Sequence, residues 1–137
     1  MAGVVGRTAL VDGLFRFYMD AEVQVLADAQ EAALEASIAG EEAVRHTIDT
    51  TPSDLSRVPK GNRNWTFKMR QAVDSKVARN GNTINIRIGW LDDQEGYFLI
   101  QEDGGTVHGK QITAMNSLMN GKAAALDVLK GWGFTIL

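Results

Sequence analysis

The clearest pattern of hydrophobic and polar positions lies in residues 72–90, where two alternating runs flank the dipeptide Asn80-Gly81. Strict alternation is typical of a half-buried strand, and Asn-Gly is a preferred two-residue connection between the strands of a β-hairpin. The pattern therefore predicts a hairpin with one buried face. That face carries Val73, Val77, Ile84, Ile86, Ile88 and Trp90.

The position of this turn sets the pairing of the two strands. With Asn80-Gly81 as the two turn residues, Val77 faces Ile84, and Asp74 faces Arg87 on the opposite side of the hairpin. A slip of one residue would move the isoleucines into water, so the register is expected to be well specified.

A second periodicity runs from Tyr18 to about His46, without proline and with Gly40 as its weak point. Small or apolar residues recur there at spacings of three, four and seven, which indicates a long helix of roughly 43 Å. Leu26, Leu34 and Ile38 widen its apolar face, so the helix can pack on its own sheet, on a neighbouring subunit, or on both. The stripe consists of Tyr18, Ala21, Val25, Ala29, Ala32, Ala36, Ala39 and Ala43.

The remaining segments have weaker signals. Thr50–Trp65 holds both prolines and is expected to be a long loop. A short helix is expected from about Gln94 to Asp103, closed by Gly104-Gly105, because glycine commonly ends helices. Residues 111–129 are expected to be helical, with Ile112, Met115, Leu118 and Met119 on one face. The apolar tail, 134–137, is expected to form an edge strand or to dock on a neighbour.

Together these segments predict an α+β fold. A long N-terminal helix is packed on a small antiparallel sheet containing the β-hairpin, with short C-terminal helices. The length of 137 residues indicates one domain over 1–137. No apolar run approaches the roughly 18 residues of a membrane span, and no signal peptide is expected. The absence of cysteine excludes disulfides and thiolate metal sites.

Charge is distributed unevenly along the chain. Between Asp54 and Arg87 lie eight basic and two acidic residues, a net charge of +6, while the rest has six basic and fifteen acidic residues, or -9. This segment is either a solvated face or a surface that meets nucleic acid or the acidic part of a neighbouring copy. The prediction for a partner surface centres on Arg57, Lys60, Arg63 and Trp65.

A search for catalytic residues finds little. His46 lies near the end of the long helix, where a cation interacts well with the helix dipole, and His108 has no second ligand at metal spacing. The acids Asp92, Asp93, Glu95, Glu102 and Asp103 more plausibly solvate a turn and a helix face than form an acid–base pair. No phosphate-binding glycine motif is present. We therefore expect no enzymatic activity, no metal and no cofactor.

The stretch "YFLIQEDGGT", from Tyr97 to Thr106, resembles a motif of the tail-completion family of tailed bacteriophages, typified by the HK97 gp10-like proteins. That motif has Tyr, a few apolar residues, Glu, any residue and Gly-Thr. The order of elements over roughly residues 22–129 is similar to the family's as well. Two departures exist: an extra glycine separates Glu102 from Gly105-Thr106, and the family's Pro-x-x-Thr-Gly signature is not intact after Pro52.

The resemblance implies a structural protein of the virion, assembled in the host bacterial cytoplasm. It would form a homo-oligomeric ring, most simply a hexamer, in the neck that joins head and tail, with the connector and the tail-tube or terminator proteins as partners. DNA in the channel is a possible non-specific contact, and no membrane is involved. The motif residues Tyr97, Glu102, Gly104, Gly105 and Thr106 would form a structural turn, with Glu102 capping a helix or pairing with a basic group.

Two other functions stay open from the residues alone. One is a small nucleic-acid-binding protein that uses the basic 57–87 region, although aromatic residues are not interleaved with the basic ones there. The other is a small hydrolase or nuclease built on the acids between Asp92 and Asp103.

Overall fold

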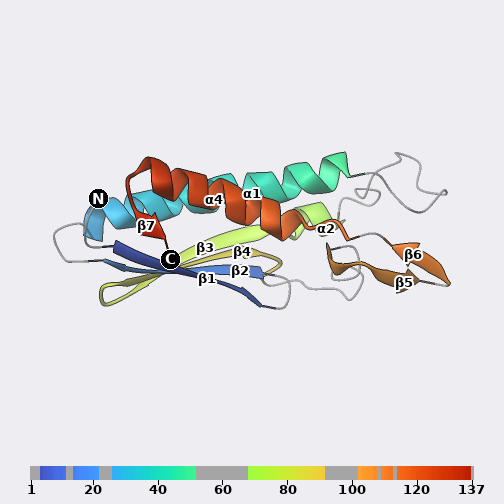
Figure 1. Cartoon of the computed structure of the whole chain (residues 1–137), viewed down its shortest axis with the longest axis horizontal. Coiled ribbons are helices and arrows are strands. Elements are labelled where there is room, and N and C mark those ends of the chain that lie inside the picture. The colour runs from blue at the N-terminus through green and yellow to red at the C-terminus, as the bar shows by residue number, and fades with distance from the viewer. Residues whose placement is uncertain are drawn as a thin grey trace.

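The structure is a computed structural model that describes residues 4–11, 14–21, 26–51, 68–91, 102–107, 109–112 and 114–136; for 4–21 the description covers the backbone. Two long helices lie side by side on one face of a twisted sheet, and a separate two-stranded hairpin projects from one end (Figure 1). The elements, in chain order, are β1 Val4–Val11, β2 Leu14–Ala21, α1 Leu26–Thr50, α2 Lys68–Gln71, β3 Asp74–Asn80, β4 Thr83–Gly89, β5 Gly105–Val107, β6 Lys110–Ile112, α4 Ser117–Gly131 and β7 Thr135–Ile136.

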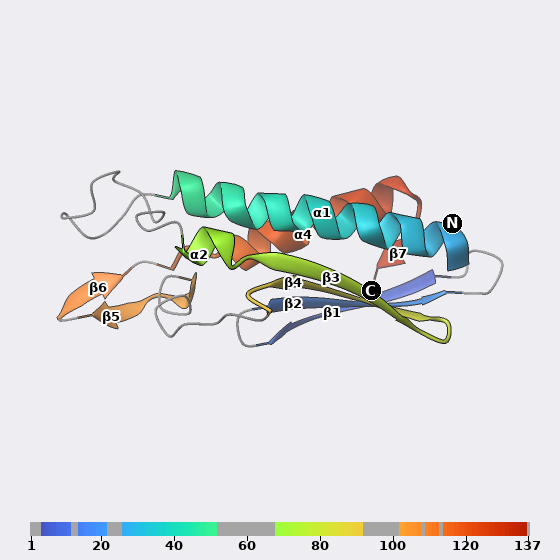
Figure 2. The same ribbon diagram turned by 180° about the vertical axis from the view of Figure 1, so that it is seen from behind.

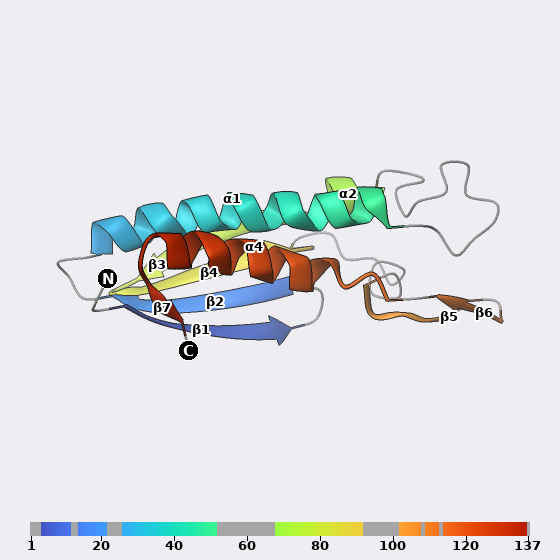
Figure 3. The ribbon, with the colours of Figure 1, turned by 45° about the horizontal axis from the view of Figure 1, so that its top comes forward.

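The main sheet has five strands in the order β3-β4-β2-β1-β7. Neighbouring strands pair antiparallel except β1 and β7, which pair parallel. The helix α1 lies above β3 and β4, and α4 lies above β2, β1 and β7 (Figures 2 and 3). The second sheet, β5-β6, is a short hairpin. The predicted α+β class, with a long helix on an antiparallel sheet and a C-terminal helix, is confirmed.

The predicted start of the long helix at Tyr18 is wrong. Residues 14–21 form strand β2, and α1 runs from Leu26 to Thr50. The period-three spacing of Tyr18, Ala21 and Val25 coincided with an alternation of period two in the same segment. Asp12-Gly13, between the paired residues Val11 and Leu14, is a common hairpin connection and is the signal that predicts this strand pair.

The predicted β3–β4 hairpin exists, but its register is shifted by two residues. Val77 pairs with Ile86 rather than Ile84, and Lys76 rather than Asp74 faces Arg87. The turn residues are Gly81-Asn82, with Gly81 at φ 60°. Glycine at the first central position is typical of a type II′ turn, and the turn lies one residue later than the predicted Asn80-Gly81. A shift of two keeps every side chain on its predicted face.

The core lies between the sheet and the two helices. Ile84, Ile86 and Ile88 alternate inward from β4, as predicted, and Val77 packs partly buried beside them. Ala29, Ala32, Ala33 and Ala36 of α1 are fully buried, and Gly40 of the same helix lies against the backbone of Gly121 in α4. The indole Nε1 of Trp90 is buried and donates to the Met69 carbonyl oxygen at 2.9 Å, which satisfies its polar group inside the core.

The C-terminal part differs in detail from the expectation. Ile112 belongs to strand β6 rather than to a helix, and α4 begins only at Ser117. Met119, predicted on the buried face, is 49% exposed. The tail does form an edge strand, β7, beside β1. Of the expected short helix 94–103, only residues 102–103 are described, and they are helical.

Candidate functional site

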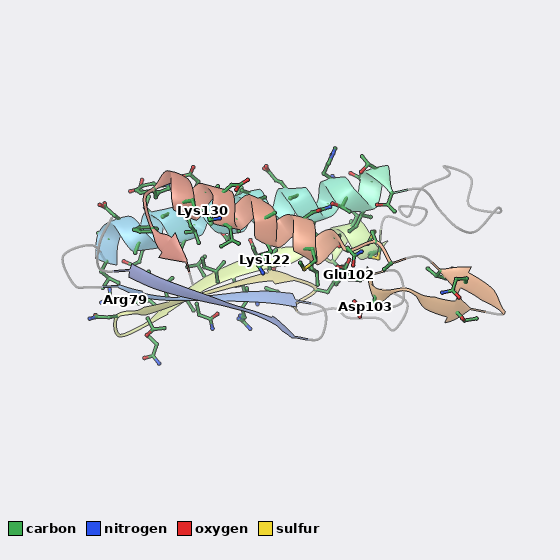
Figure 4. All side chains as sticks on the ribbon, viewed as in Figure 1. Arg79, Glu102, Asp103, Lys122 and Lys130 are labelled. Carbon is green, nitrogen blue, oxygen red and sulfur yellow. The ribbon has the colours of Figure 1, made fainter. Side chains whose placement is uncertain are left out.

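The family-like stretch from Glu102 to Thr106 lies at the junction between the β5–β6 hairpin and α4 (Figure 4). Glu102 is 4% exposed although it carries a carboxylate, whereas the neighbouring Asp103 is exposed. A buried charge is costly unless hydrogen bonds compensate it. The partners of Glu102 therefore decide what the stretch does.

The Glu102 carboxylate caps the N-terminus of α4. Its Oε1 accepts a hydrogen bond from the backbone N–H of Ser117 at 2.8 Å and another from the Ser117 hydroxyl. Its Oε2 accepts from the backbone N–H of Leu118 at 2.8 Å. The first N–H groups of a helix have no partner within the helix and carry positive partial charge, so a carboxylate satisfies both needs.

The residue that normally caps a helix does not do so here. Asn116, at the N-cap position, has φ 56° and makes no side-chain cap hydrogen bond. Instead, the backbone N–H groups of Met115 and Asn116 both donate to the Glu102 carbonyl oxygen, at 3.1 and 3.2 Å. Glu102 thus holds four consecutive residues at the start of α4 through both its main chain and its side chain. Of the two roles expected for Glu102, capping or pairing with a basic group, these hydrogen bonds correspond to the first.

The backbone at residue 104 requires glycine. Its φ is 83°, a left-handed value that glycine adopts without the steric cost of a Cβ. A Cβ at this residue would also lie 3.0 Å from the carbonyl oxygen of Ile112 and 3.1 Å from the N of Ala114. The chain from Glu102 to Thr106 therefore presses directly on the segment leading into α4, and Gly105 pairs with Ile112 in the β5–β6 ladder.

The arrangement has structural rather than catalytic chemistry. Both oxygens of Glu102 are occupied by fixed N–H and O–H donors, which leaves this carboxylate poorly placed to exchange a proton with a substrate. Among the described residues no group of three or more histidine or acidic side chains is arranged to hold a metal ion. His46 is exposed on α1. Ser117, the hydroxyl partner of Glu102, was not predicted; its place at the start of a helical pattern was the available signal.

Several predicted site residues lie outside the described residues. They are Arg57, Lys60, Arg63 and Trp65 of the partner surface, Tyr97 of the motif, His108, and the acids Asp92, Asp93 and Glu95.

Some of the basic and acidic residues pair with each other within the chain. The Arg70 Nε donates to the Asp49 carboxylate at 3.0 and 3.1 Å, which joins α2 to the end of the acidic helix α1. Glu41 accepts from the Ser75 hydroxyl at 2.7 Å and forms an ion pair with Arg45. The Arg45 Nη2 in turn donates to the Val73 carbonyl oxygen at 2.7 Å. Sequence reasoning did not single out Arg45, whose partners are about 28 residues away along the chain.

A row of basic residues occupies paired positions on three neighbouring strands of the main sheet. In the register, Arg87 of β4 pairs with Lys76 of β3 on one side and with Arg16 of β2 on the other. Lys76 is exposed and Arg87 half-buried, on the face opposite the buried isoleucines. Like charges directly opposite each other on neighbouring strands destabilise a sheet.

None of the helices in the described part of the chain combines the length and hydropathy needed to cross a bilayer. Comparison of the chain with models of protein families, with curated proteins and with solved structures finds no match.

Proposed function

We propose that this chain is a structural protein of a tailed-bacteriophage virion that forms a ring in the neck and joins the head connector to the tail, in a tail-completion or terminator role. The observation that carries the proposal is the role of Glu102. The stretch that resembles the family's Glu-Gly-Thr motif anchors α4 through a buried carboxylate, both oxygens of which accept hydrogen bonds from the start of that helix. A motif with this role suits a protein whose task is assembly.

The shape of the sheet is compatible with a ring. Its two edges are different strands, β3 on one side and β7 on the other, and each lies beneath a different helix (Figure 3). A ring made of one kind of chain needs two different patches that fit each other, repeated by a rotation that closes. Six copies are what the resemblance implies, with the connector and the tail-tube or terminator proteins above and below the ring.

The proposal is tested by complementation. A phage genome lacking this reading frame should yield full heads and separate tails, and supplying the chain in trans should restore joined particles that contain it. Electron microscopy of the purified chain should show rings. Joined particles of normal yield without the chain would contradict the proposal.

A second candidate function is nucleic-acid binding, which the row of Lys76, Arg87 and Arg16 favours. Strands lie about 4.8 Å apart, so the row spans roughly 10 Å and can contact neighbouring phosphates. Binding of double-stranded DNA that weakens steeply with salt, and that Arg87→Ser lowers, would support it. Binding unaffected by Arg87→Ser would contradict a role of this face.

A further inference from the structure

Large apolar side chains are exposed at three places in the described helices. Leu34 and Ile38 of α1 are 56% and 57% exposed, and Met119 of α4 is 49% exposed. Exposed apolar side chains that lie next to each other often mark contacts with other molecules, as Leu34 and Ile38 do on one helix face. The helix faces that carry these side chains are therefore candidate contact surfaces.

On α1, Leu34 and Ile38 share a face with Glu41 and Arg45, at spacings of four, three and four residues. Glu41 bonds to Ser75 and Arg45 to the Val73 carbonyl oxygen, so this face overhangs the β3 edge of the sheet. The exposed part of the face is flanked by acids. We name it the α1 ridge, and it consists of Glu31, Leu34, Ile38 and Glu42.

On α4, the residues in contact with α1 are Gly121, which packs against Gly40, and Asn120, whose Nδ2 donates to the Thr47 hydroxyl at 2.8 Å. The opposite face of α4 therefore points away from α1, over the β1 and β7 side of the sheet. Figure 4 shows its two lysines on the near side of α4, with α1 behind. We name this face the α4 ridge, and it consists of Met119, Lys122, Leu126 and Lys130.

The two ridges match in spacing, and in antiparallel contact they match in charge at the end where Glu31 of one ridge meets Lys130 of the other. Each has its four residues at positions i, i+3, i+7 and i+11, a length of roughly 16 Å along a helix. The α1 ridge carries two aliphatic side chains between two glutamates, and the α4 ridge carries two lysines beside Met119 and the half-buried Leu126. The α1 ridge lies on the β3 side of α1 and the α4 ridge on the face of α4 turned away from α1, so they cannot meet within one chain.

We infer that the α1 ridge of one copy docks against the α4 ridge of the next copy of this chain. Within a chain α1 and α4 run antiparallel, since Gly40 meets Gly121 while Glu35 meets Trp132. A neighbour in the same orientation repeats that arrangement, which sets Glu31 opposite Lys130 and Leu34 opposite Leu126. The contact joins two different patches and so propagates head to tail. This inference rests on the proposed ring and names its subunit contact.

The test uses charge reversal in the full chain. Glu31→Lys places two cations at the contact, and Lys130→Glu places two anions there. Each variant alone should self-associate at least about tenfold more weakly than the parent, because like charges across an interface are costly. An equimolar mixture should recover association, since alternating copies restore every Glu–Lys pair. Sedimentation velocity at about 50 mM salt, where screening is weak, measures the species.

Two further variants control the interpretation. Asp103→Lys makes the same charge change as Glu31→Lys at an exposed residue that belongs to neither ridge, beside the β5–β6 hairpin, and should associate normally (Figure 4). Leu34→Gln with Ile38→Gln alters exposed side chains, so it should keep the parent melting temperature and lose association.

Three results would overturn the inference: a parent chain that stays monomeric, a mixture that does not recover, or loss of association in Asp103→Lys as large as in Glu31→Lys. Failure here is distinct from failure of the proposed function. Normal head–tail joining by Glu31→Lys would refute this contact alone, whereas association through the ridges by a chain that does not join particles would refute the function alone.

Discussion

Gly40 of α1 and Gly121 of α4 face each other where the two helices pack. A Cβ on Gly121 would lie 2.7 Å from Val44 Cγ2 and 3.1 Å from the Gly40 carbonyl oxygen. The backbones of α1 and α4 are therefore so close at this point that neither residue can carry a side chain without a clash. The contact brings the acidic α1 alongside α4 and leaves the two ridges on helix faces that cannot meet within one chain.

Gly121→Ala should destabilise the fold by about 1–2 kcal/mol, because the clash outweighs the gain in helix propensity. Gly131→Ala, in the same helix, is the matched control: nothing lies within 4 Å of its Cβ, so it should be neutral or stabilising. Chemical denaturation of both variants measures the difference. Equal stability of the two would show that the helices separate without cost.

Glu102→Gln should lower the free energy of unfolding by about 1–3 kcal/mol. The amide NH₂ group would replace one acceptor oxygen with a donor, which would then face an N–H group of α4. Asp103→Asn, at the exposed neighbouring residue, should change stability by less than about 0.5 kcal/mol. Hydrogen exchange of the Ser117 and Leu118 amides should be faster in Glu102→Gln only. Unchanged exchange at these two amides would contradict the capping role.

Gly104→Ala and Gly109→Ala separate backbone strain from packing. Both glycines have left-handed φ, 83° and 77°, but only Gly104 has backbone atoms close to the position of a Cβ. Both variants should lose about 1–2 kcal/mol from the φ value, and Gly104→Ala should lose more. Melting temperatures compare them. A larger loss in Gly109→Ala would contradict the close packing of Gly104 on the segment before α4.

Ile86→Asp should cost about 4 kcal/mol or more, because it places an unpaired charge in the core where Ile86 is fully buried. Ala78→Asp, at an exposed position of the paired strand β3, should cost about 1 kcal/mol or less. Thermal melting monitored by circular dichroism measures both. A parent-like melting temperature for Ile86→Asp would mean that β4 turns its other face to the helices.

Joint replacement of Arg57, Lys60 and Arg63 by serine tests the partner surface expected from the sequence. Because almost no apolar residues lie between 53 and 64, the variant should keep the parent melting temperature. Ring formation or head–tail joining should be impaired, measured as the yield of joined particles on complementation. If particles join normally at low and high salt, the segment from 53 to 64 is only a solvated connection. If the variant is unfolded, the segment is a structural element of the fold instead.

The sequence by itself determined the elements whose pattern is local. Alternation over 72–90 predicted the β3–β4 hairpin and its buried face, and the alanine stripe predicted a long helix with room for a second backbone. The Glu-x-Gly-Gly-Thr stretch predicted a capped structural turn. These signals are local because helix and strand periodicities, and glycine's freedom at positive φ, depend on neighbouring residues.

Tertiary structure alone decided what these elements meet. Residues 14–21 satisfy both a helical and a strand period, and pairing with β1 and β4 makes them a strand. The helix that Glu102 caps begins 15 residues later, and Arg45 and Trp132 find partners 28 and 97 residues away. Such contacts depend on how the chain closes its loops, and no local pattern encodes which distant groups meet. The placement of the two ridges on faces that cannot meet within one chain has the same origin, since it follows from the packing of α1 against α4.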